Sequence, residues 1–387
     1  MNNRELFHAT MRRENDGRLL HMEQGFNISR SEWLAEGLPP TVSTDGCPQL
    51  EGGDLFEHMN VSGYAYCHFQ QFCIPEFEQK VLEEGDKTRV EISPNGVTRR
   101  VMTKGHGSPP HEIDFAIQTP ADYREHRHRL TGNIDRRVDT ARWAETGPRL
   151  KAQVNHPVTL WTHGPFAFLR ELVGTENAMI LPYTEEAMIK LMLRDHLEKC
   201  MAAAAPVIEA CKPDMCFVWE DCCGSTGPFI APDIFEKLMA PWYREWKDYL
   251  VGMGVPWIML DTDGDPGPLV RNWYEAGVDC LQPWEVNSVD MLRFAEEFTQ
   301  YVMMGGIYKH MFEPNDPAQV GRFKTADLFE AIDQELERVV KPMAGRGGYI
   351  AALDHWAFWG TTYKGYKHYA KELERYGKAN RWATVSK

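Results

Sequence analysis

The sequence lacks any long apolar segment. No run of apolar residues approaches the ~18 residues that a membrane-spanning helix needs, although 43% of the 387 residues are hydrophobic. Residues 1–15 are polar and mixed in charge, without the apolar core of a secretory signal. We therefore expect a cytoplasmic protein without a membrane-spanning segment.

Paired cysteine motifs are also missing. The nine cysteines are scattered, and no two form the Cys-x-x-Cys pair typical of zinc ribbons and thioredoxin-like sites. A chain of this length does not need disulfides for stability, so free thiols are expected. Cys222 and Cys223 are adjacent, and adjacent side chains of an extended segment point in opposite directions. We interpret this pair as structural.

Positive charge is scarce. The chain has 42 Lys+Arg against 56 Asp+Glu, a formal net charge of -14. This charge repels phosphate backbones, so nucleic acid is not an expected partner. No G-x-G-x-x-G motif follows a predicted strand and no Walker A sequence occurs, which disfavours a nucleotide-binding sheet.

What the sequence does contain is a regular alternation of apolar strands and amphipathic helices. Strands are predicted over residues 19–24, 215–219, 256–260, 280–283, 302–307 and 349–353. Helices are predicted over residues 3–13, 183–211, 232–250, 268–275, 289–298, 325–340 and 362–376. Apolar strands that alternate with helices indicate a parallel sheet covered on both faces. The fold class is therefore α/β, either a doubly wound sheet or a closed (β/α)8 barrel.

A different pattern occupies residues 79–103. Polar and apolar residues alternate on both sides of Ser93-Pro94-Asn95-Gly96, and Asn-Gly between alternating segments is a strong hairpin signal. Helical patterns follow from about residue 122, which argues against an all-β domain. We predict a β-hairpin insertion at about residues 76–112.

Polar and ionisable side chains directly follow the apolar residues of the predicted strands. They are His21, Glu220, Asp261, Asp263, Glu285, Tyr308, Lys309, Asp354 and His355. Any one of these acids alone is better explained as a helix cap. Their recurrence at the carboxyl ends of the strands, where barrel enzymes carry their active sites, predicts one common site.

Four of these residues are predicted to be catalytic. Asp261 and Asp263 can bind a hard cation, act as acid and base, or hold a cationic substrate, and an Asx-turn is the structural alternative. Asp354 can orient the imidazole of His355 for proton transfer. The sequence leaves the presence and kind of a metal open.

Aromatic residues flank the same strand ends. They are Trp219, Trp257, Trp284, Trp356, Phe358 and Trp359. Large barrels need bulky residues between strands and helices, which accounts for part of this set. An aromatic wall also suits a flat or hydrophobic ligand. The predicted substrate-binding residues are His21, Trp219, Glu220, Glu285, Tyr308, Lys309 and Trp356.

With these features the chain resembles the uroporphyrinogen decarboxylase superfamily over essentially its whole length. The resemblance rests on an ordered series of motifs: Asn3-Arg4-Glu5-Leu6-Phe7, Gly164-Pro165-Phe166, Trp219-Glu220-Asp221, Gly305-Gly306-Ile307-Tyr308-Lys309 and Gly347-Gly348-Tyr349-Ile350. It implies one (β/α)8 TIM barrel over residues 1–387, with the hairpin as an excursion. It also implies a homodimer.

The superfamily holds the decarboxylase and corrinoid-linked methyltransferases, and this chain departs from both. The Arg-rich N-terminal segment of the decarboxylase is missing, and residues 21–24 (HMEQ) stand in its place. The thiol-activating methyltransferases carry a His-x-Cys zinc motif where this chain has Asp261-Thr262-Asp263. Oxygen ligands favour a harder divalent metal, or no metal, over a thiol-activating zinc ion.

The resemblance then implies a methyltransferase that demethylates a small methoxylated or methylated, aromatic substrate, with cobalamin arriving on a separate corrinoid protein. The predicted acids would protonate the leaving heteroatom, because an alkoxide leaves poorly at neutral pH. The alternative is a decarboxylase of a carboxylated aromatic or tetrapyrrole, in which Lys309 or His21 would hold the carboxylate. A barrel that only binds a ligand is a third hypothesis, although clustered ionisable groups are costly unless used.

Overall fold

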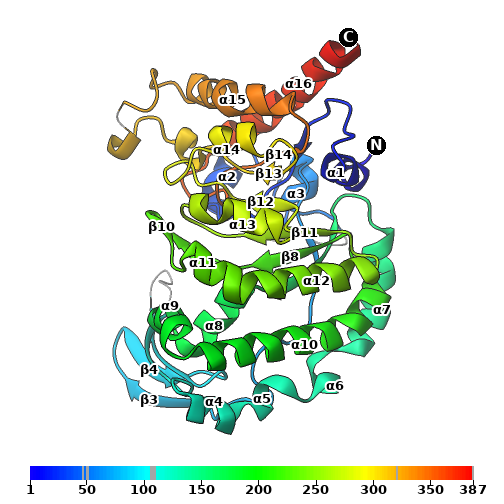
Figure 1. Cartoon of the computed structure of the whole chain (residues 1–387). Helices are drawn as coiled ribbons and strands as arrows, with labels where there is room; N and C mark the ends of the chain where they lie inside the picture. Colours follow the sequence, from blue (N-terminus) through cyan, green and yellow to red (C-terminus); the bar gives the residue numbers. More distant parts are fainter. Residues whose placement is uncertain (46–47, 49–51, 105–109, 320, 386–387) are drawn as a thin grey trace.

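Eight parallel strands form the central sheet of the computed structural model, which describes residues 1–45, 48, 52–104, 110–319 and 321–385. The strand order is β1-β14-β13-β12-β11-β8-β7-β2, and Figure 1 shows the sheet near the middle of the molecule. The strands are β1 Leu20–His21, β2 Ala65–Cys67, β7 Val158–His163, β8 Met215–Trp219, β11 Trp257–Asp261, β12 Cys280–Gln282, β13 Val302–Met304 and β14 Tyr349–Ala351.

Helices pack around this sheet and connect its strands. They are α1 Asn3–Met11, α2 Arg30–Ala35, α3 Leu55–Met59, α4 Pro120–His126, α5 His128–Thr131, α6 Ile134–Arg137, α7 Thr140–Ala152, α8 Pro165–Val173, α9 Thr175–Thr184, α10 Glu186–Cys211, α11 Pro232–Ile234, α12 Ala240–Gly252, α13 Val270–Glu275, α14 Met291–Glu297, α15 Leu328–Ala344 and α16 Tyr363–Val385. None of the helices in the described part of the chain is long and apolar enough to cross a membrane.

The predicted alternation of strands and helices from residue 215 onward is confirmed. The structure adds β2, β7 and α9, which the sequence did not predict, and the helix predicted over residues 183–211 is α10, which begins three residues later, at Glu186. The strand predicted over residues 302–307 ends at Met304, because glycines with positive φ follow, at Gly305 (φ 113) and Gly306 (φ 74).

The inner face of the sheet is apolar through most of its depth. Its side chains form a separate core cluster with α1: Phe7, Met11, Leu20, Met22, Tyr64, Met215, Phe217, Met259, Cys280, Val302, Met304, Ile350 and Ala352. Asp214, just before β8, anchors α1 by accepting hydrogen bonds from Arg4 Nε (2.8 Å) and pairing with His8 Nε2 (2.8 Å). Helix α1 therefore covers the end of the sheet where the strands begin.

The two edges of the sheet approach one another. Met22, directly after β1, forms a parallel bridge with Ser62, three residues before β2. The amide of Ser62 donates to His21 O (3.0 Å), and the amide of Glu23 donates to Ser62 O (2.9 Å). The sheet is therefore curled, with β1 and the segment leading into β2 side by side.

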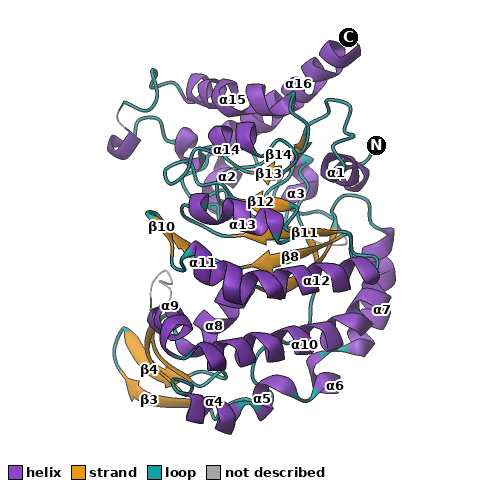
Figure 2. Cartoon of the chain, in the orientation of Figure 1, coloured by secondary structure: helices purple, strands orange, loops and turns teal. Residues whose placement is uncertain are grey.

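A second, antiparallel sheet lies outside the first. Its strands, in the order β3-β4-β5-β6, are Lys80–Glu84, Thr88–Ile92, Val97–Met102 and His111–Phe115, and Figure 2 shows it in orange at the lower left. The predicted turn at residues 93–96 joins β4 to β5, where Ser93 Oγ accepts from the amide of Val97 (3.1 Å). The insertion is thus larger than the predicted hairpin, with four strands rather than two.

Candidate active site

Four neighbouring strands place side chains at one level of the inner face. His163 pairs in register with Trp219, Trp219 with Asp261, and Asp261 with Gln282. Side chains alternate between the two faces of a strand, so these residues lie one layer beyond the apolar cluster, toward the carboxyl ends. Trp219 and Asp261 are half-buried, which shows that solvent reaches this layer. We call these four residues the inner layer.

A hydrogen-bonded chain holds Asp261 in place. The hydroxyl of Tyr64, fully inside the sheet, donates to Gln282 Oε1 (2.7 Å), and Gln282 Nε2 donates to Asp261 Oδ1 (3.1 Å). Because Tyr64 occupies the amide oxygen of Gln282, the amide NH₂ must face Asp261. The second carboxyl oxygen, Oδ2, is left for other partners.

The carboxyl group of Asp261 is disposed to keep its proton. Burial raises its pKa well above the ordinary value for aspartate, and the nearby negative charges of Asp263, Asp221 and Glu285 add to this effect. The hydrogen bond from Gln282 opposes the shift but does not reverse it. A neutral carboxylic acid in a solvent-reached layer can donate a proton to a bound molecule.

Three further carboxylates surround Asp261. Asp221 and Asp263 belong to the loops that follow β8 and β11, and Glu285 follows β12. Glu285 Oε2 accepts from the amide of Gly264 (3.0 Å) and so ties two of these loops together. Gly264 has φ +81, and a Cβ there would lie 2.5 Å from Gly224 O, so the Asp-x-Asp-Gly turn requires glycine.

His355 pairs with Asp263 and not with Asp354. Its Nε2 lies 3.7 Å from Asp263 Oδ2, and both side chains are more than a third exposed. The buried carboxylate of Asp354 instead accepts from the amides of Lys309 (2.9 Å) and Val286 (3.2 Å). Burial raises the pKa of Asp354. The predicted Asp354–His355 unit is therefore replaced by an Asp263–His355 pair, while Asp354 ties strand ends together.

Aromatic rings form one wall of the inner layer. The ring centroid of His163 lies 4.6 Å from that of Trp161 and 5.1 Å from that of Trp219. His163 Nδ1 is buried without a hydrogen-bond partner among the described residues, and burial lowers the pKa of His163 to about 3. The imidazole of His163 is therefore neutral. At the Trp219 end of this wall, Arg170 of α8 lies 4.9 Å from the Trp219 ring and binds Asp221 Oδ2 at 2.7 Å.

The structure places His21 outside this site. Leu20 and Met22 point inward, so His21 and Glu23 face the opposite side, toward α16. His21 Nε2 lies 2.9 Å from Glu23 Oε1, which also accepts from the hydroxyl of Tyr369 (3.0 Å). The side chain that was predicted to bind substrate packs between the sheet and a helix.

Glu220 also faces away from the inner layer, because Trp219 takes the inward position. It is fully buried, and its carboxyl group accepts from the hydroxyl of Tyr243 (2.7 Å) and the amide of Ala167 (3.1 Å) at the start of α8. Burial raises the pKa of Glu220 to about 7. Its position corresponds to a helix cap, the structural alternative considered for each of these acids.

The other predicted substrate-binding residues differ in burial and in position. Tyr308 is buried, donates to Gln319 Oε1 (2.7 Å) and lies under the guanidinium of Arg322. Lys309 and Trp356 are half-buried near the carboxyl ends of β13 and β14. Lys309 makes no ion pair within 4 Å among the described residues.

A metal is not supported by these side chains. Within the described ranges, no three His, Cys, Asp or Glu side chains lie close enough to share one ion. Asp263 and Glu285 are engaged with His355 and with the Gly264 amide, respectively. The carboxylates surround Asp261 without converging on one point.

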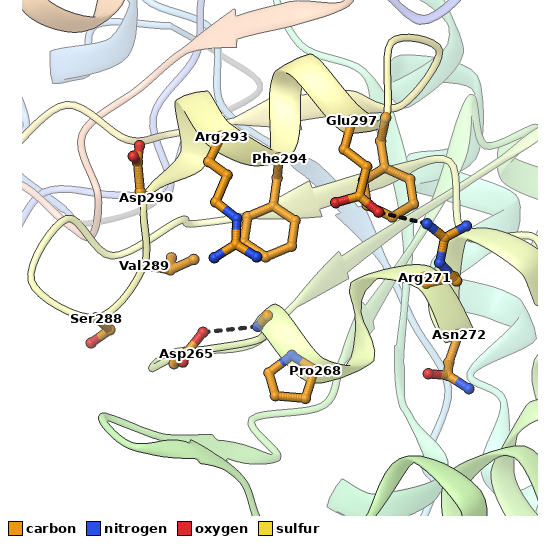
Figure 3. A pocket seen from close by; sticks show the side chains of 12 residues that line it. Asp265, Pro268, Arg271, Asn272, Ser288, Val289, Asp290, Arg293, Phe294 and Glu297 are labelled. Atoms are coloured by element: carbon orange, nitrogen blue, oxygen red, sulfur yellow. Dashed lines mark hydrogen bonds and ion pairs between the residues drawn. The ribbon is translucent and has the colours of Figure 1, made fainter.

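A separate pocket of about 570 Å³ lies beside the site, between the loop after β11 and helix α14. In Figure 3 the Arg293 guanidinium projects over the space between Phe294 and Pro268, and the Arg271–Glu297 ion pair (2.5 Å) lies at its far end. The lining residues include none of those predicted for the site. This pocket is therefore distinct from the inner layer.

Several residues of the site were missed in the sequence. His163, Trp161 and Arg170 belong to β7 and α8, and Tyr64 precedes β2. The signal for the first two was present: residues 158–163 (VTLWTH) are an apolar stretch that ends in an ionisable residue, like the strands that were recognised. Arg170 and Tyr64 carry no comparable signal.

No family model and no curated protein sequence matches the chain. Among solved structures it is similar to a methyltransferase from Methanosarcina mazei, with a TM-score of 0.57 and 12% sequence identity. The similarity covers 97% of this chain and 99% of the methyltransferase. At this identity the similarity concerns the fold, and it extends over the whole length of both chains.

Proposed function

We propose that the chain is a methyltransferase that removes a methyl group from the heteroatom of a small methoxylated or methylated substrate. The acceptor is the cobalt of a cobalamin carried by a separate corrinoid protein. The observation that carries the proposal is the position of the Asp261 carboxyl group, which accepts from Gln282 Nε2 beside Trp219 in a solvent-reached layer, where burial raises its pKa. In this proposal the curled sheet closes into a (β/α)8 barrel through the Met22–Ser62 bridge.

The chemistry needs an acid at that position. The bond between the methyl carbon and the heteroatom breaks, and its electron pair stays on the heteroatom. The reduced cobalt of the corrinoid protein would supply the electron pair for the new bond to the methyl carbon. The heteroatom then takes the proton of Asp261, because an alkoxide or phenoxide leaves poorly at neutral pH. Asp263 and His355, both exposed at the rim, return a proton from solvent to Asp261.

A decarboxylase acting on a carboxylated aromatic or tetrapyrrole is the second candidate. The half-buried ammonium of Lys309 favours it, since among the described residues it makes no ion pair within 4 Å and could hold a carboxylate. The carboxylates around Asp261 weigh against it, because they repel an anionic substrate.

The test is a methyl-transfer assay with free cob(I)alamin as acceptor and a panel of methyl ethers and methylated amines. Formation of methylcobalamin, followed by absorbance, is the expected result, and Asp261→Asn should slow it by about 100-fold or more. Glu245→Gln, on the outer surface of α12, is the matched control that keeps the rate. Carbon dioxide release from carboxylated aromatics without methylcobalamin would establish the decarboxylase instead.

A further inference from the structure

A cavity of about 390 Å³ lies next to the aromatic wall of the inner layer, beyond the end of strand β2. Its lining comes from residues 68–70 after β2, from helix α6 and the start of α7, and from Trp161 of β7. The ring centroids of Trp161 and His163 are 4.6 Å apart, so Trp161 belongs both to the cavity and to the aromatic wall. Small-molecule sites have volumes of about 300–1,000 Å³. We call this cavity the α6–α7 pocket.

The α6–α7 pocket has an excess of positive charge, although the net charge of the chain is -14. Arg136, Arg137 and Arg142 line it, together with one acid, Asp139. Asp139 is the N-cap of α7, where its Oδ1 accepts from the amide of Arg142 (2.9 Å). Within the described part of the chain, none of the three guanidinium groups forms an ion pair with a carboxylate. The lining therefore favours an anion.

The charges farther from the pocket do not neutralise this excess. Lys199, 2% exposed, lies near enough to Arg137 for the two positive charges to repel each other. The acid that acts on Lys199, Asp195, is already paired with another arginine at 2.6 Å. Asp135 and Glu145, close to the pocket arginines in sequence, form no ion pair with them in the part that the structure describes. The field at the pocket is therefore positive.

Arg137 provides a second observation, because it is a buried cation without a counter-ion. Its side chain is 2% exposed, and its guanidinium donates only to backbone carbonyls, of which Phe72 O is nearest to it (2.6 Å). These bonds fix the group at the pocket but do not compensate its charge, and a buried charge is costly unless it is paired. One N–H of Nη2 remains for a further acceptor. A bound anion would supply both the charge and the acceptor.

Two indole rings determine the shape of the group that can accompany the anion. Trp143 is buried and donates through Nε1 to His68 O (3.1 Å), and the Arg142 guanidinium lies 4.8 Å from its ring. An arginine stacked on an indole keeps its N–H edge free for a carboxylate or phosphate. Trp161 is half-buried and has no cation over its ring among the described residues. Its exposed surface suits a flat, apolar group.

We propose that the α6–α7 pocket binds a small aromatic anion, with the carboxylate or phosphate group between Arg136, Arg137 and Arg142 and the ring against Trp161. Carboxylates and phosphates are the anions that arginine binds through paired N–H donors. A docked protein is a poorer occupant, because the cavity has the volume of a small-molecule site and one of its arginines is buried. This site goes beyond the proposed methyl transfer and does not depend on it.

Binding can be measured on the purified full chain without any cobalamin. The probes are benzoate, its neutral amide benzamide, and phenyl phosphate, each titrated by calorimetry and tryptophan fluorescence at constant ionic strength. At least one of the two anions should bind about ten-fold or more tightly than benzamide, since only an anion gains from the arginines. Tighter binding of benzoate identifies a carboxylate site, and tighter binding of phenyl phosphate identifies a phosphate site.

The double variant Arg136→Gln/Arg142→Gln locates the site. It is preferred to a substitution of Arg137, because loss of that side chain would leave buried backbone carbonyls without donors. The double variant should weaken binding of the anion by about ten-fold or more and leave the melting temperature and benzamide binding unchanged. Arg293→Gln is the matched control, since it removes an exposed arginine from the separate pocket beside α14. It should leave anion binding unchanged.

Four results would overturn the inference. They are the absence of binding of both anions at millimolar concentration, equal binding of the anions and benzamide, binding that survives in the double variant, and an equal loss in Arg293→Gln, which would reveal a general effect of net charge. Each is distinguishable from failure of the proposed function. A chain that binds no aromatic anion yet methylates cob(I)alamin from neutral methyl ethers keeps the methyltransferase proposal and loses only this site.

Discussion

Asp261 has a raised pKa although solvent reaches its side chain. In most aspartates, access to solvent favours the ionised form and keeps the pKa low. The proposed reaction uses the protonated form of Asp261. Methyl transfer should therefore be fast at pH values below the raised pKa and slow down as pH rises through it. The expected pH profile of methyl transfer therefore falls on its alkaline side, and infrared spectra should show a protonated carboxyl band that disappears in Asp261→Asn. A band unchanged in that variant belongs to another group and contradicts the assignment.

Tyr64 controls how Asp261 is held, through the orientation of Gln282. In Tyr64→Phe the amide of Gln282 loses the partner that fixes it, so the hydrogen bond that lowers the pKa of Asp261 weakens. We expect the alkaline fall of the rate to move to higher pH. In a Gln282→Leu background, Tyr64→Phe should add no further shift. Equal shifts in both backgrounds would show that Tyr64 acts by another route.

The candidate site could be predicted from the sequence only as far as the strand ends. The sequence locates Asp261, Asp263 and Glu285, because an acid after an apolar strand is visible without any structure. It does not show which face each side chain takes. Successive side chains of a strand point to opposite faces, so the face depends on the exact position of the residue in the strand. Trp219 points inward, and Glu220, one residue later, points outward.

At the scale of single elements, strand β1 carries its polar residues on the outer face. His21 contacts Glu23, Tyr366 and Tyr369 there. His21→Ala should lower the free energy of unfolding by about 1–2 kcal/mol, because the buried Glu23 loses a hydrogen-bond partner. Methyl transfer should not change. Loss of methyl transfer at an unchanged melting temperature would show that His21 does act in the substrate site.

Helix α8 begins against the carboxyl group of Glu220, whose pKa is raised to about 7 by burial. An unfolded glutamate titrates near 4.3, so the folded state holds the extra proton between about pH 4 and 7. Its stabilising contribution is complete below this window and is lost as pH rises through it, at a cost of roughly 3 kcal/mol. Glu220→Gln should flatten the dependence of melting temperature on pH between 4 and 7, measured against the unmodified chain.

The length of a strand did not decide whether it was predicted: β12, β13 and β14 have three residues each and were predicted, whereas the six-residue β7 was missed. Strand β8 has five apolar residues, and β11 has four apolar residues before Asp261; a helix follows each of them, which satisfies the pattern for a parallel sheet. Strand β2, Ala65–Cys67, is followed by the antiparallel strands β3 to β6 and not by a helix, so the alternation of strand and helix is absent there. The helix predicted over residues 183–211 begins at Glu186, because Glu185 (φ -133) is not helical, and the sequence carries no glycine there to mark this start.

For the whole molecule, the anchoring of α1 by Asp214 closes one end of the sheet. Asp214 is 7% exposed and accepts from Arg4 and from the amide of Val158 (2.6 Å) while pairing with His8. Asp214→Asn leaves Arg4 without its counter-charge and should lower the free energy of unfolding by about 3 kcal/mol. Chemical denaturation measures this. An equal loss in Arg4→Ala, with no further loss in the double variant, would confirm the pair.

The covering of the inner face by Phe7 and Met11 also has a consequence for the order of events. A site covered at that end would be reached only from the carboxyl ends of the strands. In the proposed reaction, the corrinoid protein would cover the side from which the small substrate enters. The demethylated product would then depart only after the corrinoid protein has left, and the separation of the two proteins would limit the rate of each turnover.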